Sequence, residues 1–451
     1  MTETNSADKN LMTTGPVGQK IVRFALPLFL GNIFQQLYNT ADSLIVGNFV
    51  GSEALAAVSS SGNLIFMVTS FFIGIASGAG VLIGSSIGAG DRKWTETTVH
   101  TTVAFGIICS VIMTLIGILL APPILILMQT PEDVLPLSIT YFRIYFAGAF
   151  GFVMYNTFVG ILQAAGDSRH PLYYLIFSSV VNIILDLIFV GPLKMGVAGA
   201  ALATDISQIA SALLCFVRLV RTDADYRIVP RKIRIEKRTL RLVLGQGLPA
   251  GLQNSVMGFS NVVIQSYINA YGTAAVAGIG AYIKIEGFVF IPITSFALAI
   301  TTFVSQNRGA GQKERIKDGV RFGLICTLVI AEILGLLLAV FSPQMIYLFD
   351  RNPEVIHYGV MRARIVTPFF FLCAYTHAMS GVLRGLGKPI PSLLAFLLCW
   401  CVVRVAGLAI VELFVHTIMT TYIIYPATWA LSSLFLFFYY RHVKKTYLVT
   451  E

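Results

Sequence analysis

The sequence contains few charged residues: Asp, Glu, Lys and Arg together make up 12% of its 451 residues, whereas 56% are hydrophobic. Soluble domains carry about 25% charged residues, so this chain has roughly half of that density. A soluble protein of this length could not bury so much apolar surface. The composition therefore predicts an integral membrane protein and excludes an ordinary soluble enzyme or binding domain.

Other features are missing as well. The six cysteines all lie in apolar stretches, which favours buried packing residues over disulfides or metal ligands. The net charge of +10 comes with no aromatic-basic RNA signature and no zinc-ligand spacing, so we expect no nucleic-acid partner. No catalytic motif or cofactor fingerprint occurs, so we predict a protein that is not an enzyme and has no cofactor. We also expect it to act as a monomer. Residues 1–14 lack the apolar region of a cleaved signal peptide.

Apolar runs long enough to cross a bilayer are abundant, since about 20 helical residues span its hydrocarbon core. We predict an all-α integral membrane protein with twelve transmembrane helices in two six-helix lobes. The first lobe is expected at 20–221 and the second at 242–440, with tails at 1–19 and 441–451 and a basic linker at 222–241. The expected spans are 20–45, 54–86, 95–122, 134–163, 171–193, 197–220, 242–269, 275–306, 316–342, 355–384, 390–414 and 418–440.

Basic residues give the orientation of these spans. Most of the 32 Lys and Arg residues fall in the tails and in the loops of one side, above all in the linker. The loops of the other side contain two, Lys194 and Arg351. By the positive-inside rule both termini are expected in the cytoplasm of a multi-pass protein of the inner (plasma) membrane. Six spans per lobe then give both lobes the same orientation, related by a pseudo-two-fold axis along the membrane normal.

An internal repeat supports the two-lobe prediction. One constant offset in residue number maps Gly88-Ala89-Gly90 onto Gly309-Ala310-Gly311, and Gly166 onto Gly387. Pro27 and Pro249 are related by an offset that is greater by one. Membrane proteins built from two like halves are commonly secondary transporters, whose substrates are handled where the repeats meet.

Polar residues inside the expected spans are the candidates for function, because intramembrane acids are costly. Gln35, Asn39 and Asp42 are spaced by four and three residues, which places them on one face of the first span. Asn182 and Asp186 share a face of the fifth span. An unpaired carboxylate there should bind a cation or a proton, although a hydrogen-bonded clamp between helices is the alternative.

The sixth and eighth spans also carry polar groups. Thr204 could supply an oxygen ligand, and Asp205 could pair with Arg143 or face a wet cavity. Lys284 and Glu286 are two residues apart and therefore point to different faces. Glu286 is a candidate for contact with substrate. The seventh span has a polar stripe that suits a cavity wall or helix packing, formed by Gln253, Met257, Asn261 and Gln265.

Comparison of the two copies of the repeat distinguishes candidate functional residues from residues that both lobes share. The positions equivalent to Asp42 and Asp186 in the second lobe are apolar residues or glycine. Side chains that only stabilise the packing of helices would tend to occur in both copies of the repeat. Acids present in one copy only therefore suggest a site that couples ion movement to transport.

In these residues the chain resembles the multidrug and toxic compound extrusion (MATE) transporters, and in particular the DinF/MepA-like branch of that family. The resemblance runs over nearly the whole length and depends on several short strings in order. They are Pro27 with Ala41-Asp42-Ser43-Leu44-Ile45-Val46-Gly47, Gly88-Ala89-Gly90, Leu162-Gln163-Ala164-Ala165-Gly166-Asp167, Gly199-Ala200-Ala201-Leu202-Ala203-Thr204, Gly247-Leu248-Pro249, and Lys284-Ile285-Glu286-Gly287-Phe288 with Pro292.

The resemblance implies an alternating-access antiporter that exports amphipathic, often cationic compounds against an inward H+ or Na+ gradient. It implies coupling roles for Asp42, Asn182 and Asp186, with Thr204 as a neighbour; the first three would be metal ligands if Na+ is the coupling ion. The glutamate that the NorM branch carries on the seventh helix is replaced by Met257, so a NorM-type cation site is not expected here. Substrate and membrane lipid are the expected partners. A lipid-linked precursor flippase, with Arg143, Arg364 and Arg404 facing phosphates, is the alternative.

Overall fold

The computed structural model describes residues 11–127 and 130–449, so the first ten residues of the expected N-terminal tail and the end of the C-terminal tail lie outside it. Within the described residues the chain forms helices and turns without any strand, which confirms the all-α prediction. The first half contains α1 (Val17–Phe49), α2 (Ser52–Gly88), α3 (Arg92–Leu127), α4 (Leu135–Ala147), α5 (Ala149–Ala164), α6 (Arg169–Val190) and α7 (Gly196–Arg221).

The second half repeats this order. A short 3-10 turn, Pro230–Lys232, lies in the linker before it. The helices of the second half are α8 (Lys237–Asn269), α9 (Thr273–Gly309), α10 (Lys313–Tyr347), α11 (Pro353–Val366), α12 (Phe370–Gly385), α13 (Pro389–Leu394), a π-helical segment (Ala395–Val403), α14 (Arg404–Glu412) and α15 (Ile418–Val443).

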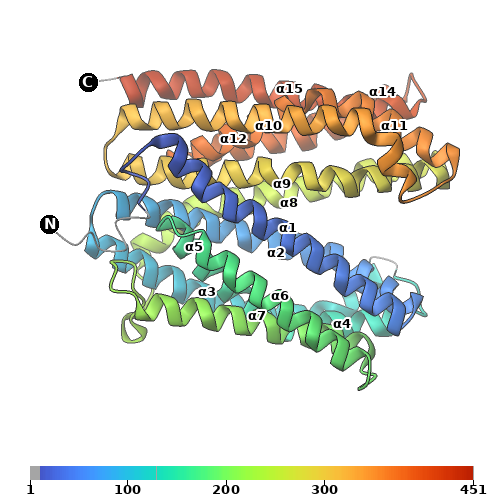
Figure 1. Cartoon of the computed structure of the whole chain (residues 1–451), viewed down its shortest axis with the longest axis horizontal. Coiled ribbons are helices and arrows are strands. Elements are labelled where there is room, and N and C mark those ends of the chain that lie inside the picture. The colour runs from blue at the N-terminus through green and yellow to red at the C-terminus, as the bar shows by residue number, and fades with distance from the viewer. Residues whose placement is uncertain (1–10, 128–129, 450–451) are drawn as a thin grey trace. The chain divides into compact units, whose positions relative to one another are not determined.

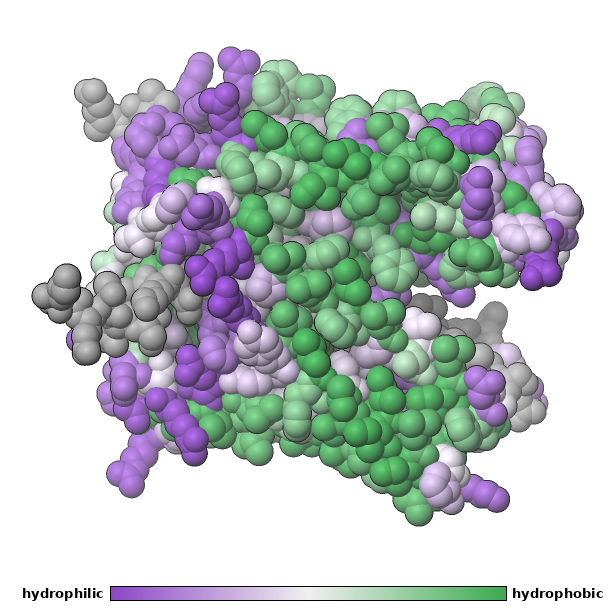
Figure 2. All heavy atoms as spheres, viewed as in Figure 1, coloured by the Kyte–Doolittle hydropathy of each residue, from purple (hydrophilic) through white to green (hydrophobic). Residues whose placement is uncertain are grey.

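The lengths of the helices fit membrane spans. Nine helical segments of the described chain are long and apolar enough to cross a bilayer, and the pair α4 and α5, bent by 48° at Gly148, makes a tenth. The remaining two of the twelve expected spans correspond to α1 and α8. Each is 33 residues long but contains polar side chains that lower its hydropathy. Figure 2 shows hydrophobic side chains along the middle of the helices and hydrophilic ones gathered near their ends, as a bilayer-spanning protein requires.

The internal repeat is confirmed by the backbone. Helices α2 and α9 have 37 residues each, α5 and α12 have 16 residues each, and both pairs begin at positions related by the offset of the glycine repeat. The turns match too: Gly90 and Gly311 both have φ of 68°, a left-handed conformation that favours glycine. The glycines that the sequence repeat singled out are therefore the residues that end equivalent helices.

The chain packs into two compact units that do not coincide with the lobes expected from the sequence. Unit 1 contains Leu11 and residues 30–251, and unit 2 contains residues 12–29 and 252–449. The beginning of α1 therefore belongs to the core of unit 2, while the beginning of α8 belongs to unit 1. Pro27 and Pro249 lie next to these two division points, where the missing N–H of proline weakens the helix ladder.

Helix α2 and the first part of α8 approach each other closely within unit 1 (Figure 1). A Cβ atom added to Gly74 would lie 2.4 Å from the backbone of Gly251, and one added to Gly78 would lie 2.4 Å from that of Gly247. Each helix thus presents two glycines four residues apart to the other. Small residues at this spacing allow membrane helices to pack backbone against backbone.

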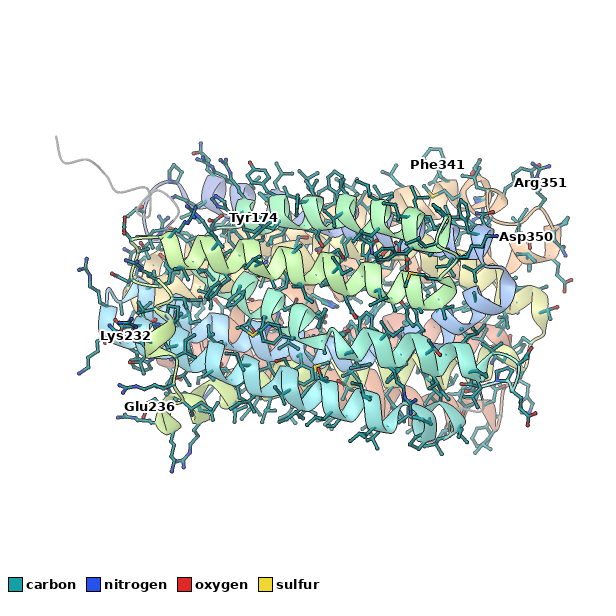
Figure 3. All side chains as sticks on the ribbon, turned by 90° about the horizontal axis from the view of Figure 1, so that it is seen from below. Tyr174, Lys232, Glu236, Phe341, Asp350 and Arg351 are labelled. Atoms are coloured by element: carbon teal, nitrogen blue, oxygen red, sulfur yellow. The ribbon has the colours of Figure 1, made fainter. Side chains whose placement is uncertain are left out.

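The linker is folded onto unit 1. The amide of Val229 donates to His100 Nε2 over 2.9 Å, and Lys232 forms an ion pair of 2.7 Å with Glu96. Figure 3 places Lys232 and Glu236 at one end of the helices of unit 1. The amide of Glu236 donates to Thr101 Oγ1 there. The basic linker expected from the sequence is therefore an ordered part of unit 1.

Candidate functional site

Helices α6 and α7 and the part of α1 that packs in unit 1 carry the residues predicted to couple transport. The start of α6 is fixed by Asp167, whose carboxylate accepts hydrogen bonds from the amides of Arg169 and His170 at 3.2 Å each and contacts His170 Nδ1 at 2.6 Å. Burial opposes the ionisation of Asp167, but the hydrogen bonds and charge of His170 outweigh it and hold the pKa of Asp167 below its ordinary value. A carboxylate at this position also stabilises the helix N-terminus.

Asp42 on α1 and Asp186 on α6 form the centre of the site, and we call them the carboxyl pair. Asp42 is 9% exposed and Asp186 is fully buried. Their side chains are hydrogen-bonded to each other, and one oxygen of each, Oδ1, has no partner among the described residues. An ionised carboxylate can only accept hydrogen bonds, so a bond between two carboxyl groups contains at least one proton.

Asn182 and Thr204 support the carboxyl pair from one side. With its nitrogen facing Asp186, the Asn182 amide donates to Asp186 Oδ2 over 3.0 Å and accepts from the amide of Thr204 over 3.3 Å. This orientation is preferred because the opposite one would point the amide oxygen at a carboxyl oxygen. The Thr204 hydroxyl is also hydrogen-bonded to Tyr38, one turn before Asp42 on α1. The structure thus brings together all four residues predicted to take part in coupling.

Asp205 is close to this network but makes a different contact. Its carboxyl group accepts a hydrogen bond from the backbone of Gly148, where the span α4–α5 is bent. A Cβ atom at Gly148 would lie 2.0 Å from Asp205 Cγ, so only glycine permits this approach. Arg143, the partner considered from the sequence, donates instead to the carbonyl of Ile118. The contact places the Asp205 carboxyl group against the backbone at the bend between α4 and α5.

The remaining candidates do not gather at one place. Gln35 and Asn39 are exposed on the part of α1 that belongs to unit 1. In unit 2 the stripe on α8 is split: Gln253 is buried and accepts from Ser380, whereas Asn261 is exposed. Met257 packs against an apolar cluster of unit 2.

Glu286 belongs to a group of charged residues that the sequence did not reveal. Its carboxyl group accepts from Tyr282 over 2.9 Å, and the buried side chains of Arg362 on α11 and Arg404 on α14 lie nearby. We call Glu286, Arg362 and Arg404 the arginine cluster. Lys284 points elsewhere, toward the ring of Phe349, as the spacing predicted. Arg362 could have been noticed as an unpaired charge in an apolar span, the signal that identified Asp42 and Asp186.

The donor set limits which ions could bind. No group of three or more His, Cys, Asp or Glu side chains capable of holding a metal occurs among the residues that the structure describes. A sodium ion would have to use the oxygens of Asp42, Asp186, Asn182 and Thr204, and the Asn182 amide is already held between Asp186 and Thr204. The direct contact between the two carboxyl groups fits a bound proton more closely than a cation separating them.

A polytopic helical repeat with carboxyl groups buried among its membrane spans is typical of a membrane transporter. The family model described as MatE matches residues 27–188 and 249–435, so the chain belongs to the MATE family. It is 31% identical over 436 residues to the "Probable multidrug resistance protein YoeA" of Bacillus subtilis, covering 95% of this chain and 94% of that protein. It is 27% identical over 360 residues to a protein of Shewanella oneidensis named "FAD transporter", covering 78% of each.

Solved structures confirm the twelve-helix fold. The structure described as "Crystal structure of MATE in complex with MaL6" is similar with a TM-score of 0.91 and 25% identity, over 99% of this chain and all of that one. This chain is therefore a multi-pass membrane protein of a transporter family. The roles of its individual residues stay predictions.

Proposed function

We propose that the protein is an antiporter that couples inward movement of protons to the export of amphipathic organic compounds. The carboxyl pair carries this proposal, because it is a buried, proton-dependent contact between α1 and α6. Relatives named as multidrug resistance proteins, such as YoeA, support the substrate class. The protein would act as a monomer in the inner (plasma) membrane with both termini in the cytoplasm, needing no cofactor besides the coupling ion.

Proton loss would change the contact between α1 and α6. With a proton, the two carboxyl groups attract each other through a hydrogen bond. Without one, two negative charges at the usual separation of a hydrogen bond, about 3 Å, would repel by about 5.5 kcal/mol at an effective dielectric constant of about 20. The first part of α1 packs in unit 2 and the part with Asp42 packs in unit 1, so α1 is the element through which a displacement at Asp42 would reach unit 2. Protonation and substrate binding can then favour different conformations, which is what exchange requires.

The driving force depends on the stoichiometry. Exchange of one proton for one monovalent cation is electroneutral, so each unit of pH difference supplies about 1.4 kcal/mol, or tenfold accumulation. Two protons would add the membrane potential, about 2.3 kcal/mol per net charge per 100 mV. The alternative, a flippase for lipid-linked precursors, has less support because Arg364 is exposed and Arg143 donates to the carbonyl of Ile118.

Purified protein in proteoliposomes tests the proposal. A fluorescent cationic dye loaded inside should leave when a pH gradient is imposed in the absence of sodium, and a sodium gradient at equal pH should have no effect. Dye movement driven by sodium alone would refute proton coupling. Binding and movement of lipid-linked sugars without dye efflux would favour the flippase.

A further inference from the structure

The arginine cluster of unit 2 is positively charged in a membrane-spanning region. Arg362 is 1% exposed and Arg404 is 2% exposed, and guanidinium groups stay charged in proteins. Glu286 is the acidic group whose charge acts on both of them. Two fixed positive charges and at most one negative charge leave the cluster with an excess of at least one positive charge. Buried charges are costly unless they are compensated.

The hydrogen-bonding capacity of the two arginines is not used up. Arg404 donates through Nε and Nη2 to a single acceptor, Thr428 Oγ1, at 3.1 and 2.9 Å. Arg362 is hydrogen-bonded to Tyr425, but its Nε and Nη1 atoms have no acceptor among the described residues. Glu286 does not supply one, since none of the ion pairs within 4.0 Å in the described chain joins it to either arginine. Charged donors without an acceptor are the components of an anion site.

Aromatic rings hold both guanidinium groups in place. Arg404 lies 4.4 Å from the ring centre of Tyr425 and 5.0 Å from that of Trp400, and Arg362 lies 4.7 Å from Tyr425 and 5.2 Å from Tyr282. Such contacts orient a guanidinium group and exclude water without neutralising it. The rings therefore keep the positive charges available to an anion.

The position of the cluster relates it to the carboxyl pair. The constant offset that relates the glycines of the repeat also maps Tyr141 onto Arg362 and Thr204 onto Tyr425. The slightly greater offset shared by the two helix prolines maps Asn182 onto Arg404. The second half thus carries basic side chains on the helices equivalent to those that surround the acids of the first half.

We propose that Arg362 and Arg404 form an anion-binding site that takes the carboxylate or phosphate group of an exported amphipathic compound, in competition with Glu286. Glu286 and Tyr425 are partly exposed, so they are the edge at which a ligand would enter, and Glu286 is the internal anion that it displaces. The inference rests on the proposed export function and adds that compounds with an acidic group are substrates. Amphipathic compounds suit the aromatic lining, which offers apolar contact beside the charge.

Tryptophan fluorescence can detect binding without any transport. The chain has three tryptophans: Trp400 contacts Arg404, Trp429 packs against Trp400, and Trp94 is an exposed residue at the start of α3. In purified full-length W94F protein, octanoate should cause a saturable change in emission, whereas the neutral octanamide should not. The R404Q variant should weaken octanoate binding by at least tenfold relative to W94F, because it removes one of the two positive charges of the site. The E286Q variant should bind roughly tenfold more tightly, since the competing charge is gone.

Matched controls separate binding from folding. Arg384 is another arginine of unit 2, outside the cluster, so R384Q should leave octanoate binding unchanged. Equal responses to octanoate and octanamide, an unchanged affinity in R404Q, or weaker binding in E286Q would each overturn the proposal; if R404Q does not fold, E286Q decides. Acetate and inorganic phosphate binding as tightly as octanoate would assign the site to a free anion and refute the substrate inference. None of these results depends on dye efflux, so the failure of proton coupling would be a separate finding.

Discussion

Replacing either member of the carboxyl pair by asparagine should uncouple transport from the pH gradient. Asparagine has nearly the size of aspartate, and its amide can donate to the remaining carboxylate of Asp42 or Asp186 whatever the pH. The contact between α1 and α6 is therefore kept in D42N and D186N, but it no longer breaks when a proton leaves. Both variants should fold and still bind the exported compound.

The expected loss of the pH response in D42N and D186N follows from the contact between the two carboxyl groups of the carboxyl pair. In the wild type, loss of the proton replaces a hydrogen bond by a repulsion of about 5.5 kcal/mol at an effective dielectric constant of about 20. A difference of about 5.5 kcal/mol moves a two-state equilibrium from about 1:99 to 99:1. Removing one of the two charges removes this term, so the conformational equilibrium of D42N or D186N should hardly respond to pH.

Dye efflux from proteoliposomes under an imposed pH gradient measures this directly. Efflux in D42N and D186N should fall to the rate seen without a gradient. The D205N variant is the matched control, because Asp205 is 8% exposed, close to the 9% of Asp42, but its carboxyl group faces the backbone of Gly148. D205N should keep gradient-driven efflux. Normal efflux in both carboxyl-pair variants, or an equal loss in D205N, would refute the reasoning.

Three further changes test the packing of unit 1, each by thermal unfolding of the purified protein. G78A should lower the melting temperature because its Cβ would meet the backbone of Gly247, whereas G245A, with nothing within 4 Å, should not. N182L should cost about 1–3 kcal/mol by leaving polar groups of the carboxyl pair without a donor; unchanged stability would contradict that hydrogen bond. The lowered pKa of Asp167 stabilises the fold above its unfolded value of about 3.9, and this contribution is lost as the pH falls through the lower folded value. D167N should therefore be less stable than the wild type at neutral pH, with a difference that shrinks in acid.

Local signals made much of the scaffold predictable. Gly90 and Gly311 end equivalent helices because both adopt a left-handed backbone conformation, which is a property of the residue type and its immediate neighbours. Asn182 and Asp186 share a face because a helix repeats every 3.6 residues. The resemblance placed Asp42 and Thr204 beside them, and the structure brings all four together.

Contacts between distant segments were not predictable in the same way. Arg362 and Arg404 lie on different helices, and no periodicity within one helix reveals that both approach Tyr425. A π-helical segment directly before Arg404 also changes which residues share a face, because each π-helical turn takes up more residues than an α-helical one. The division of α1 and α8 between the packing units depends on tertiary packing, since each helix is continuous along the chain.

The two halves of the repeat differ in a property that decides what each can do. A carboxyl group gains or loses its charge with a proton, so the acids on α1 and α6 can respond to a proton gradient. An arginine keeps its charge at every physiological pH, so Arg362 and Arg404 cannot respond in this way and can only provide a fixed attraction. If both clusters act in transport, the first half must carry the coupling and the second half must contribute to the choice of compound. The two halves share one helical fold, and the different charges of their buried side chains allow them to have different functions in transport.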